Sequence, residues 1–199
     1  MRQIIIASRN QGKIEEFKEL LTPLGITVLS LLDLADPPDI VEAGETFYEN
    51  AKLKAEAVCA ATGLPTLADD SGLVVHYLGG APGVHSARFA YPEEGDAANN
   101  AKLLAVLQGV PAYKRQAHFV SVLAWARPQQ ATRFTTGRCF GRILDAPRGE
   151  HGFGYDPLFY IPELQQTMAE IDIRVKNQVS HRAKAMQHML VLLREEYSR

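Results

Sequence analysis

The sequence predicts an α/β fold in which strand-helix units are joined by an antiparallel element. The apolar run 4–7 has the composition of a buried strand, and apolar residues at helical spacing follow it over 14–24. Two long segments, 117–126 and 132–143, have the length and composition of strands. The first pattern is typical of parallel βα units, and the second adds antiparallel strands to them.

The remaining elements of the first half follow from local signals. Gly25 is a typical helix stop, and residues 26–31 then predict a second strand. After the turn-rich stretch 36–44, Thr46 and Glu49 form a capping-box pattern that starts the next helix. Residues 66–68 predict a buried strand that ends at Asp69-Asp70-Ser71-Gly72, and 73–75 resume an extended apolar run.

The second half adds two helices. One is expected near residues 97–107. The other is an amphipathic C-terminal helix with Ser180 as its N-cap, so that His181 and Arg182 occupy its first turn. We find no internal repeat or low-complexity linker, and we expect one domain over residues 1–199.

Composition narrows the class of protein. The chain has 199 residues, of which 46% are hydrophobic and 22% are charged, which is ordinary for a globular domain. A net charge of −2 lacks the basic excess of a nucleic-acid binder. Cys59 and Cys139 belong to no disulfide or metal pattern, and no apolar stretch is long enough for a signal peptide or a membrane span. We therefore expect a reduced, cytoplasmic protein without a nucleic-acid or membrane partner.

A phosphate cradle is predicted where the first strand meets the first helix. The loop there reads Ser8-Arg9-Asn10-Gln11-Gly12-Lys13. Free backbone N–H groups and the helix dipole favour an anion at such a junction, Gly12 permits close approach, and Lys13 adds a positive charge. The same residues in isolation are also typical of an ordinary polar loop, because their spacing is not that of a known phosphate-binding fingerprint.

Three acidic residues indicate a site for a divalent cation. Glu42, Asp69 and Asp70 need a positive partner, and Mg²⁺ takes one or two protein carboxylates and completes its shell with water and phosphate oxygens. A spare carboxylate could activate water as a general base. Taken alone, Asp-Asp-Ser-Gly is more typical of a solvated turn.

Two further segments could bind a base. Gly152-Phe153-Gly154-Tyr155-Asp156-Pro157 combines glycines with aromatic rings that can stack, although a tight turn with a packed Phe has the same composition. Lys176 and the segment Ser180-His181-Arg182 could hold donors toward a ligand, although polar residues at a helix start are usually solvated.

In this order, the loops 8–13, 68–73, 79–83, 153–157 and 180–182 closely resemble the inosine triphosphate pyrophosphatase family over almost the whole chain. The resemblance implies an elongated mixed β-sheet with flanking helices forming two lobes around a central cleft, and a homodimer. It also implies Mg²⁺-dependent hydrolysis of dITP, ITP and XTP to the monophosphate and pyrophosphate, which cleanses the nucleotide pool.

The resemblance also assigns roles to residues. Ser8, Asn10, Lys13 and Lys54 would bind the triphosphate, and Ser71 would contact substrate. The other residues of the cradle loop, Arg9, Gln11 and Gly12, are expected to bind substrate as well, although Arg9 stands where the family often has a smaller residue. Glu42 and Asp70 would hold the metal, with Asp70 also the general base and Asp69 in support. Phe153, Gly154, Tyr155 and Asp156 would enclose the base, and Lys176, His181 and Arg182 would complete the purine pocket.

The hydrogen-bond donors of the predicted purine pocket indicate which bases it selects. Hypoxanthine and xanthine carry an oxygen acceptor at C6, where adenine carries an amino donor, so the donors of His181 and Arg182 favour the keto bases. The mismatch with adenine costs on the order of 1 to 3 kcal/mol. Two alternatives stay open at this point: a pyrophosphatase with another base preference, and a nucleotide sensor without catalysis.

Overall fold

The computed structural model describes residues 2–91 and 94–197. Its strands are β1 (Arg2–Ile6), β2 (Ile26–Ser30), β3 (Thr66–Val75), β4 (Gln116–Ala126), β5 (Arg133–Ile143), β6 (Phe159–Ile161) and β7 (Gln166–Thr167). Its α-helices are α1 (Gln11–Leu21), α2 (Phe47–Thr62), α3 (Gly95–Val106), α4 (Ile173–Val179) and α5 (His181–Tyr197). Short 3₁₀ turns lie between several of these elements. The predicted α/β class is therefore confirmed.

The strands form one seven-stranded mixed sheet in the order β2-β1-β3-β4-β5-β6-β7. β1 pairs in parallel with β2 and with β3, whereas β6 pairs antiparallel with both β5 and β7. β4 and β5 are neighbours joined only by residues 127–132, a connection too short for a parallel crossover. The sheet thus combines βα units with the antiparallel element that the sequence predicts.

By its internal contacts the chain divides into two compact units. Unit 1 comprises residues 1–70, 121–137 and 182–199, and unit 2 comprises residues 71–120 and 138–181. β3, β4 and β5 each contribute residues to both units. The expectation of one domain over residues 1–199 stays a prediction.

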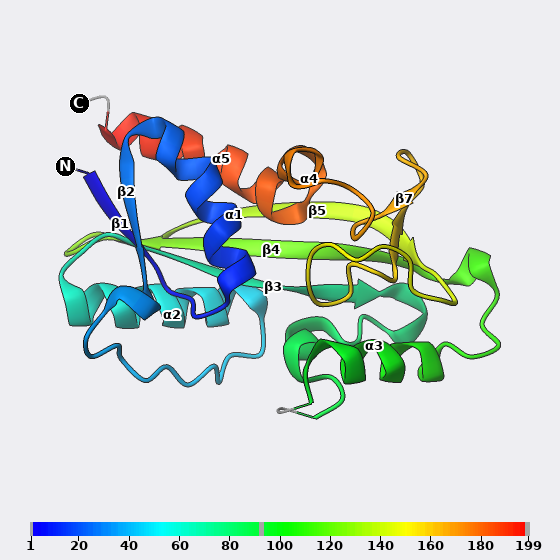
Figure 1. Ribbon diagram of the computed structural model, residues 1–199. Helices are drawn as coiled ribbons and strands as arrows, with labels where there is room; N and C mark the ends of the chain where they lie inside the picture. The colour runs from blue at the N-terminus through cyan, green and yellow to red at the C-terminus, as the bar shows by residue number, and fades with distance from the viewer. Residues whose placement is uncertain (1, 92–93, 198–199) are drawn as a thin grey trace. The chain divides into compact units, whose positions relative to one another are not determined.

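Unit 1 has helices on both faces of its strands. In Figure 1, α1 and α5 lie on one face and α2 lies on the other. The strand residues alternate accordingly: Ile4 and Ile6 pack in the cluster with α1 and α5, while Ile5 packs in the cluster with α2. Trp125 is fully buried on the α1 and α5 side. Burial of both faces explains why these strands read as continuous apolar runs.

The helices of unit 1 begin and end as their sequences predict. The Asn10 side chain caps α1 by accepting the Lys13 N–H, and Thr46 and Glu49 form a complete capping box at the start of α2. Gly25 and Gly63 take left-handed conformations where the chain leaves the first two helical segments. These local contacts fix the positions from which α1 and α2 present their lysines.

Unit 2 has its own core. It gathers apolar side chains from the C-terminal half of β3, the end of α3, and β4 to β6, as the buried residues Leu73, Leu103, Phe119 and Phe159 illustrate. The rings of Phe119 and Phe159 are tilted, with centroids 4.5 Å apart. Tyr155 belongs to the same cluster, so the aromatic loop 152–157 is anchored directly in this core.

Three features of the structure differ from the sequence-based expectation. β3 continues through Asp69-Asp70-Ser71-Gly72, so the predicted strand end at this point is wrong. The cause lies outside the strand, because cations from distant elements compensate both carboxylates and allow them to be buried. Helix α4 and the short strands β6 and β7 were not predicted. By contrast, α5 begins at His181 as expected.

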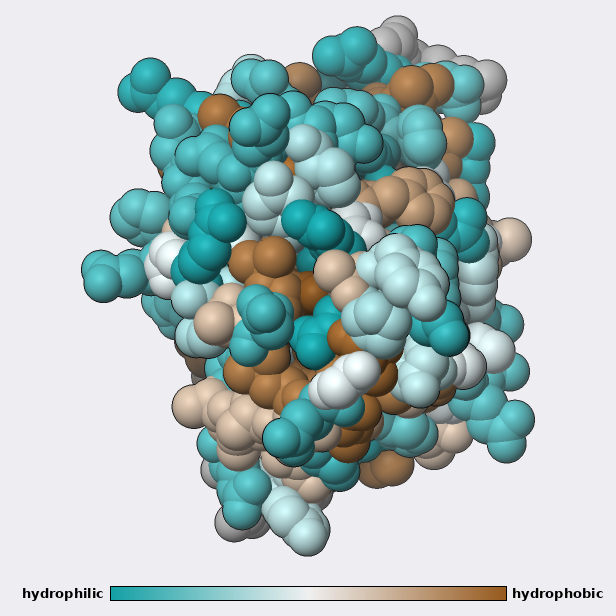
Figure 2. Space-filling view, turned by 90° about the vertical axis from the view of Figure 1, so that its right-hand side faces the viewer, coloured by the Kyte–Doolittle hydropathy of each residue, from teal (hydrophilic) through white to brown (hydrophobic). Residues whose placement is uncertain are grey.

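One face of the molecule is predominantly polar. Figure 2 shows one face on which hydrophilic side chains dominate and hydrophobic ones show in smaller groups. Within residues 2–91 and 94–197, no helix is both long and apolar enough to cross a membrane. Cys59 and Cys139 are free and buried.

Gly149 fixes the segment that leads into the aromatic loop. Its φ is +84°, and a Cβ atom there would lie 2.4 Å from the backbone carbonyl group of Ala169. The neighbouring Arg148 N–H donates to the Pro157 carbonyl at 2.9 Å, and the His151 N–H donates to the Ala169 carbonyl at 3.0 Å. This close approach of two backbones requires glycine.

We expect Gly149→Ala to lower the free energy of unfolding by about 2 kcal/mol or more, because it adds a steric clash to left-handed strain. Gly109→Ala is the matched control, since Gly109 has a φ of +76° and no atom near the position of a Cβ. We expect the control to cost about 1 kcal/mol. Urea denaturation measures both variants, and equal losses would contradict the argument from the Ala169 contact.

Candidate functional site

The site begins with two consecutive carboxylates in the middle of β3. Side chains alternate between the faces of a strand, so Asp69 follows Leu67 toward α1 and α5, and Asp70 follows Ala68 toward α2. Asp69 is 3% exposed and Asp70 is 6% exposed. Each face must therefore provide its own positive charge.

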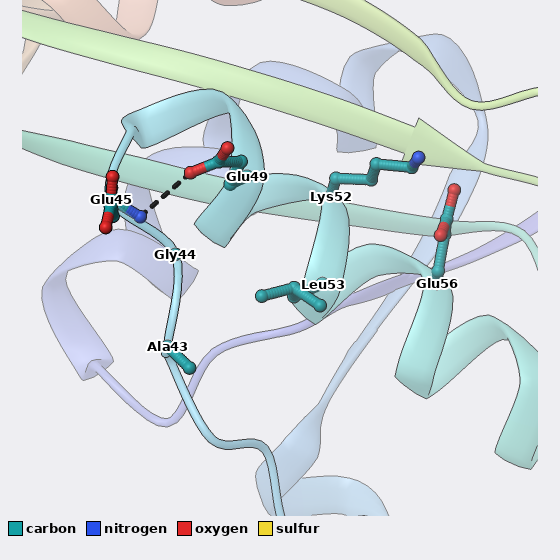
Figure 3. Close-up of a pocket in the computed structure, with 7 residues that line it drawn as sticks. All are labelled: Ala43, Gly44, Glu45, Glu49, Lys52, Leu53 and Glu56. Atoms are coloured by element: carbon teal, nitrogen blue, oxygen red, sulfur yellow. Dashed lines mark hydrogen bonds between the residues drawn. The ribbon is translucent and has the colours of Figure 1, made fainter.

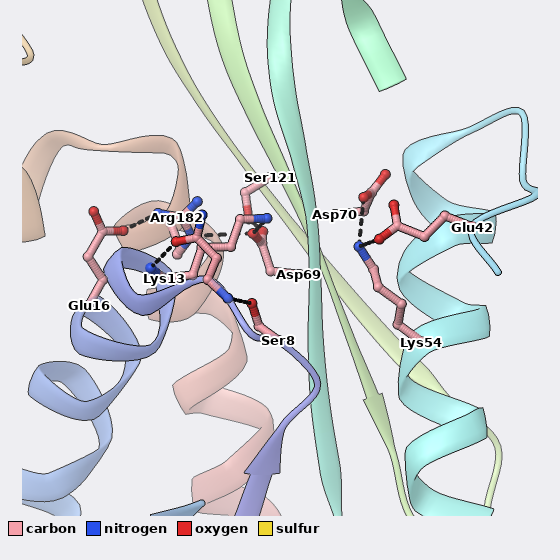
Figure 4. A network of polar contacts seen from close by, with 10 residues as sticks. Ser8, Lys13, Glu16, Glu42, Lys54, Asp69, Asp70, Ser121 and Arg182 are labelled. Carbon is pink, nitrogen blue, oxygen red and sulfur yellow. Dashed lines mark hydrogen bonds and ion pairs between the residues drawn. The ribbon is translucent and has the colours of Figure 1, made fainter. Parts of the chain in front are cut away.

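The network around Asp69 lies on the α1 and α5 side (Figure 4). Lys13 Nζ lies 2.7 Å from Asp69 Oδ2, and the Arg182 Nε lies 3.4 Å from the same oxygen. The Ser121 hydroxyl donates to Asp69 Oδ1 at 2.6 Å. The Arg182 guanidinium also forms a close ion pair with Glu16. Asp69 thus holds cations from α1 and α5 together.

The electrostatics of this network follow from its contacts. Burial alone would raise the pKa of Asp69, but Lys13 and Arg182 outweigh it and hold the pKa far below its usual value. Burial lowers the pKa of Lys13, and the nearby Arg182 adds to this effect, while Asp69 opposes it. Asp69 is therefore ionised in the folded protein and serves as the counter-ion of two cations.

A second network, around Asp70, lies on the α2 side. Lys54 Nζ lies 2.8 Å from Asp70 Oδ1 and 3.4 Å from Glu42 Oε1. Figure 4 shows the lysine reaching from α2 toward both carboxylates. Burial alone would lower the pKa of Lys54, but Asp70 and Glu42 outweigh it and raise the pKa. The sequence-predicted residues Glu42, Lys54 and Asp70 are therefore brought together.

Asp70 differs from Asp69 in one respect that bears on chemistry. Its Oδ2 atom is buried and has no hydrogen-bond partner among the described residues. Burial raises the pKa of Asp70, although Lys54 opposes the shift. A buried carboxylate oxygen without a donor is costly, so this atom is suited to a cation or a water molecule.

The loop Ser8 to Lys13 forms the entrance to α1. The Asn10 N–H donates to Ser8 Oγ at 3.1 Å, and the Lys13 N–H donates to Asn10 Oδ1 at 2.9 Å. Arg9, Asn10 and Gln11 are exposed, and Gly12 lies in the first turn of α1. The strand-to-helix junction is thus where the sequence predicts it, and its role as a phosphate cradle stays a prediction.

The aromatic loop of unit 2 is organised by a carboxylate. The Phe153 N–H donates to Asp156 Oδ2 at 3.0 Å, and Lys176 Nζ donates to the same oxygen at 2.8 Å. Lys176 Nζ also lies 4.7 Å from the centre of the Phe153 ring. A Cβ on Gly152 would lie 2.1 Å from Asp156 Oδ2, so only glycine fits there. The structure therefore brings Phe153, Asp156 and Lys176 together, and their contact with a base stays a prediction.

His181 also lies in unit 2. Its ring stacks on Phe119, with centroids 4.8 Å apart and planes 16° apart, and the residue is 6% exposed. Tyr155 of the aromatic loop is held by a hydrogen bond, because its hydroxyl donates to the Ser86 carbonyl at 2.7 Å. Burial raises the pKa of Tyr155, and Asp96 adds to the shift, so the hydroxyl stays protonated.

The predicted residues thus fall into two groups. Unit 1 contains the cradle loop, Glu42, Lys54, Asp69, Asp70 and Arg182, whereas unit 2 contains Ser71, the aromatic loop, Lys176 and His181. Arg182 forms ion pairs with Glu16 and Asp69 in unit 1, although the sequence-based expectation grouped it with the purine pocket. Its contact with a base stays a prediction.

Sequence reasoning missed two residues of the Asp69 network. Glu16 is 3% exposed and follows Lys13 by one helical turn, and Ser121 is a fully buried polar residue within the apolar strand β4. The sequence could have indicated both residues. Glu16 is an acidic residue next to the apolar face of α1, and Ser121 is a hydroxyl within an apolar strand, so each needs a polar partner when it is buried.

A surface pocket of about 370 Å³ lies beside the first turns of α2. Figure 3 shows that the loop from Ala43 to Glu45 and the side chains of Glu49, Lys52, Leu53 and Glu56 line it. The Glu45 N–H donates to Glu49 Oε2 at 2.8 Å within this pocket. None of the sequence-predicted site residues is among those that line it, although Ala43 directly follows Glu42 in the chain.

The candidate protein ligands for a metal ion are the carboxylates of Glu42 and Asp70. Within the described part of the chain, no group of three or more His, Cys, Asp or Glu residues could hold a metal ion. The pair formed by Glu42 and Asp70 is still compatible with Mg²⁺, which commonly uses only one or two carboxylates in sites that bind phosphate.

Comparison with known proteins identifies the family. The pattern of the Ham1 family matches residues 4–192. The chain is 54% identical over 186 residues to the dITP/XTP pyrophosphatase of Geobacillus kaustophilus, and the alignment covers 94% of this chain and 91% of that protein. The Ham1 protein of Staphylococcus aureus superimposes with a TM-score of 0.87 at 42% identity, covering 98% of this chain and 100% of that one.

The HAM1 protein of Coxiella burnetii gives a similar result, with a TM-score of 0.88, 42% identity, and coverage of 98% of this chain and 100% of that one. These matches agree with the resemblance that the motifs indicate, and they extend over nearly all of the chain. This chain therefore belongs to the Ham1 family.

Proposed function

We propose that this protein hydrolyses dITP, ITP and XTP to the nucleoside monophosphate and pyrophosphate. The observation that carries the proposal is the pair of networks on β3. Asp69 is paired with cations, while Asp70, near Glu42, keeps a buried oxygen that has no hydrogen-bond partner among the described residues. The proposal is supported by the relative from Geobacillus kaustophilus, a dITP/XTP pyrophosphatase that is 54% identical to this chain over 186 residues.

The triphosphate is the ligand proposed for the residues of unit 1. Lys13 and Lys54 supply positive charge, and the loop of Ser8, Arg9, Asn10, Gln11 and Gly12 supplies polar groups at the N-terminus of α1. The lysines are held by Asp69 and Asp70 in advance, so little side-chain entropy is lost when phosphate binds. Ser71, which follows Asp70 in β3, is proposed to contact the substrate as well.

Mg²⁺ is the cofactor of this proposal. The donor set fits, because Glu42 and Asp70 are both carboxylates and the Oδ2 atom of Asp70 is buried without a partner among the described residues. When bound, Mg²⁺ would offset charge on the phosphates. Glu42 and Asp70 would hold it, and Lys54 would balance the remaining negative charge of the two side chains.

Asp70 is also the proposed general base. Its side chain is buried in β3 directly before Ser71, and its Oδ2 atom has no hydrogen-bond partner among the described residues, so this oxygen is available to accept a proton. It would take a proton from the water that breaks the bridge between the α and β phosphates. Lys13 and Lys54 would stabilise the charge that develops on the leaving pyrophosphate.

The base is the ligand proposed for unit 2. The Phe153 ring offers a stacking surface, Gly154 and Tyr155 complete the loop, and Asp156 holds both the loop and Lys176. His181 offers a ring donor for the C6 oxygen of a keto purine. Arg182 follows His181 directly and is proposed to act at this end as well, while its ion pair with Asp69 also supports the phosphate side.

Three finer expectations from the sequence belong to the same proposal. They are an elongated sheet whose two lobes flank a central cleft, a homodimer, and action in the cytoplasm. Size-exclusion chromatography with light scattering tests the second of these, and a monomer at micromolar concentration would remove it from the proposal.

A substrate panel tests the proposed function. We expect pyrophosphate release from ITP, dITP and XTP to exceed release from ATP by about 5-fold to 150-fold in kcat/KM, the range that a mismatch of roughly 1 to 3 kcal/mol produces. The panel should include GTP and dTTP, and each reaction should be repeated with Mg²⁺ removed by a chelator. We expect chelation to abolish the activity.

Two outcomes of this panel would contradict the proposal. Equal turnover of ATP or dTTP would indicate a pyrophosphatase of another base preference. Binding of ITP without release of pyrophosphate, in the presence of Mg²⁺, would indicate a nucleotide sensor.

The phosphate role of Lys13 is tested by Lys13→Ala. We expect KM for ITP to rise at least about tenfold, which corresponds to about 1.4 kcal/mol of lost binding. The control is Lys18→Ala, since Lys18 is an exposed lysine of the same helix. Steady-state kinetics measure both variants, and a Lys13→Ala enzyme with unchanged KM and kcat would refute the assignment.

A further inference from the structure

The aromatic loop of unit 2 has no regular secondary structure to hold it. Residues 151–158 lie between β5 and β6 in bends and turns, so their shape depends on side chains that contact the backbone. Within the loop, Asp156 accepts the Phe153 N–H, and Tyr155 is tied to Ser86 through its hydroxyl. Gly154, between them, is not held by any of these contacts.

Helix α3 supplies the missing contacts. The Gly154 N–H donates to Asp96 Oδ2 at 2.6 Å, and Asn100 Nδ2 donates to the Gly154 carbonyl at 2.8 Å. Asp96 and Asn100 are four residues apart in α3, so they lie on the same face of the helix. Both backbone polar groups of one glycine are thus bound by one helix.

These two contacts fix more than the glycine. A peptide group is planar, so the Gly154 N–H is rigidly coupled to the Phe153 carbonyl, and the Gly154 carbonyl is coupled to the Tyr155 N–H. Gly154 has a φ of +62°, and a Cβ there would meet nothing within 4 Å. Glycine is the residue for which rotation of either peptide group is easiest, and Asp96 and Asn100 oppose both rotations.

We propose that Asp96 and Asn100 are positioning residues for base recognition, which fix two consecutive peptide groups and thereby the orientation of the Phe153 ring. The inference rests on the proposed function, in which Phe153 is the stacking surface for the purine. The contact of Asp96 is charge-assisted and short, as expected for an acceptor that resists reorientation of the N–H group. Neither side chain is assigned contact with the reacting phosphates.

The test uses the isosteric variant Asn100→Asp, which replaces the donor to the Gly154 carbonyl by an acceptor, together with Asp96→Ala. Asn99→Ala is the matched control, because Asn99 lies next to Asn100 in α3 but binds Ala87 and Ala90 instead of the aromatic loop. Urea denaturation tests whether each variant is folded. If Asn100→Asp is not folded, Asn100→Ala takes its place.

Positioning at the base end predicts a split between two kinetic parameters. We expect KM for ITP to rise about tenfold in Asn100→Asp and Asp96→Ala while kcat stays within about twofold, because stacking contributes equally to the ground state and the transition state. The preference for ITP over ATP should fall as well. Inhibition by inorganic tripolyphosphate, which lacks a base, should be unchanged, and Asn99→Ala should leave all of these values unchanged.

Other results would overturn the inference. They are an unchanged KM for ITP in both variants, or equal loss of ITP and tripolyphosphate affinity, which would indicate general destabilisation. Calorimetric binding of inosine monophosphate separates the inference from the proposed function. If the wild-type protein binds this ligand but releases no pyrophosphate from ITP, the proposed function is wrong, and a tenfold weaker affinity in the variants still supports the positioning role. A wild-type protein that does not bind it contradicts both.

Discussion

The burial of two consecutive carboxylates in the middle of β3 is the constraint on which the structure of unit 1 depends. Because strand side chains alternate, Asp69 and Asp70 leave the sheet on opposite faces, and one cation cannot serve both. Lys13 and Arg182 come to Asp69 from α1 and α5, and Lys54 comes to Asp70 from α2. Removing one partner of such a buried pair typically costs about 3 to 5 kcal/mol, so fold and site are held by the same contacts.

The two carboxylates nevertheless have different environments, and this difference supports different roles. Asp69 is surrounded by Lys13, Arg182 and Ser121, and its pKa is far below the usual value. Asp70 has one lysine, a raised pKa and a buried oxygen without a partner among the described residues. The first environment stabilises a permanent counter-ion, and the second leaves a carboxylate able to bind a cation or a proton. In unit 2, side chains also hold the backbone of the aromatic loop in place of regular secondary structure: Asp156 accepts the Phe153 N–H, and Asp96 and Asn100 of α3 bind Gly154.

The sequence predicted correctly those helix starts that depend on interactions between neighbouring residues. The Thr46 and Glu49 capping box, the Asn10 junction and the start of α5 at His181 all depend on neighbours within a few residues. The strand end at Asp69 was wrong, because charged and turn-forming residues can continue a strand only when distant cations compensate them. The contacts of Arg182 with Glu16 and Asp69 could not be predicted for the same reason, since they join segments more than 100 residues apart in sequence. The short helix α4 has too few residues for a periodic signal, although Asp172 caps it.

The central claim is that Asp70, and not its neighbour, carries the chemistry, and the rate of pyrophosphate release by Asp70→Asn tests it most directly. Asparagine removes the negative charge next to Lys54 but keeps an oxygen acceptor, and Glu42 still pairs with this lysine, so we expect the variant to fold with a lower free energy of unfolding than the wild type. At saturating ITP and Mg²⁺, we expect its kcat to fall by about 10²-fold to 10⁴-fold, the usual contribution of a general base. A folded Asp70→Asn protein that retains a kcat within a few-fold of the wild-type value would contradict the account.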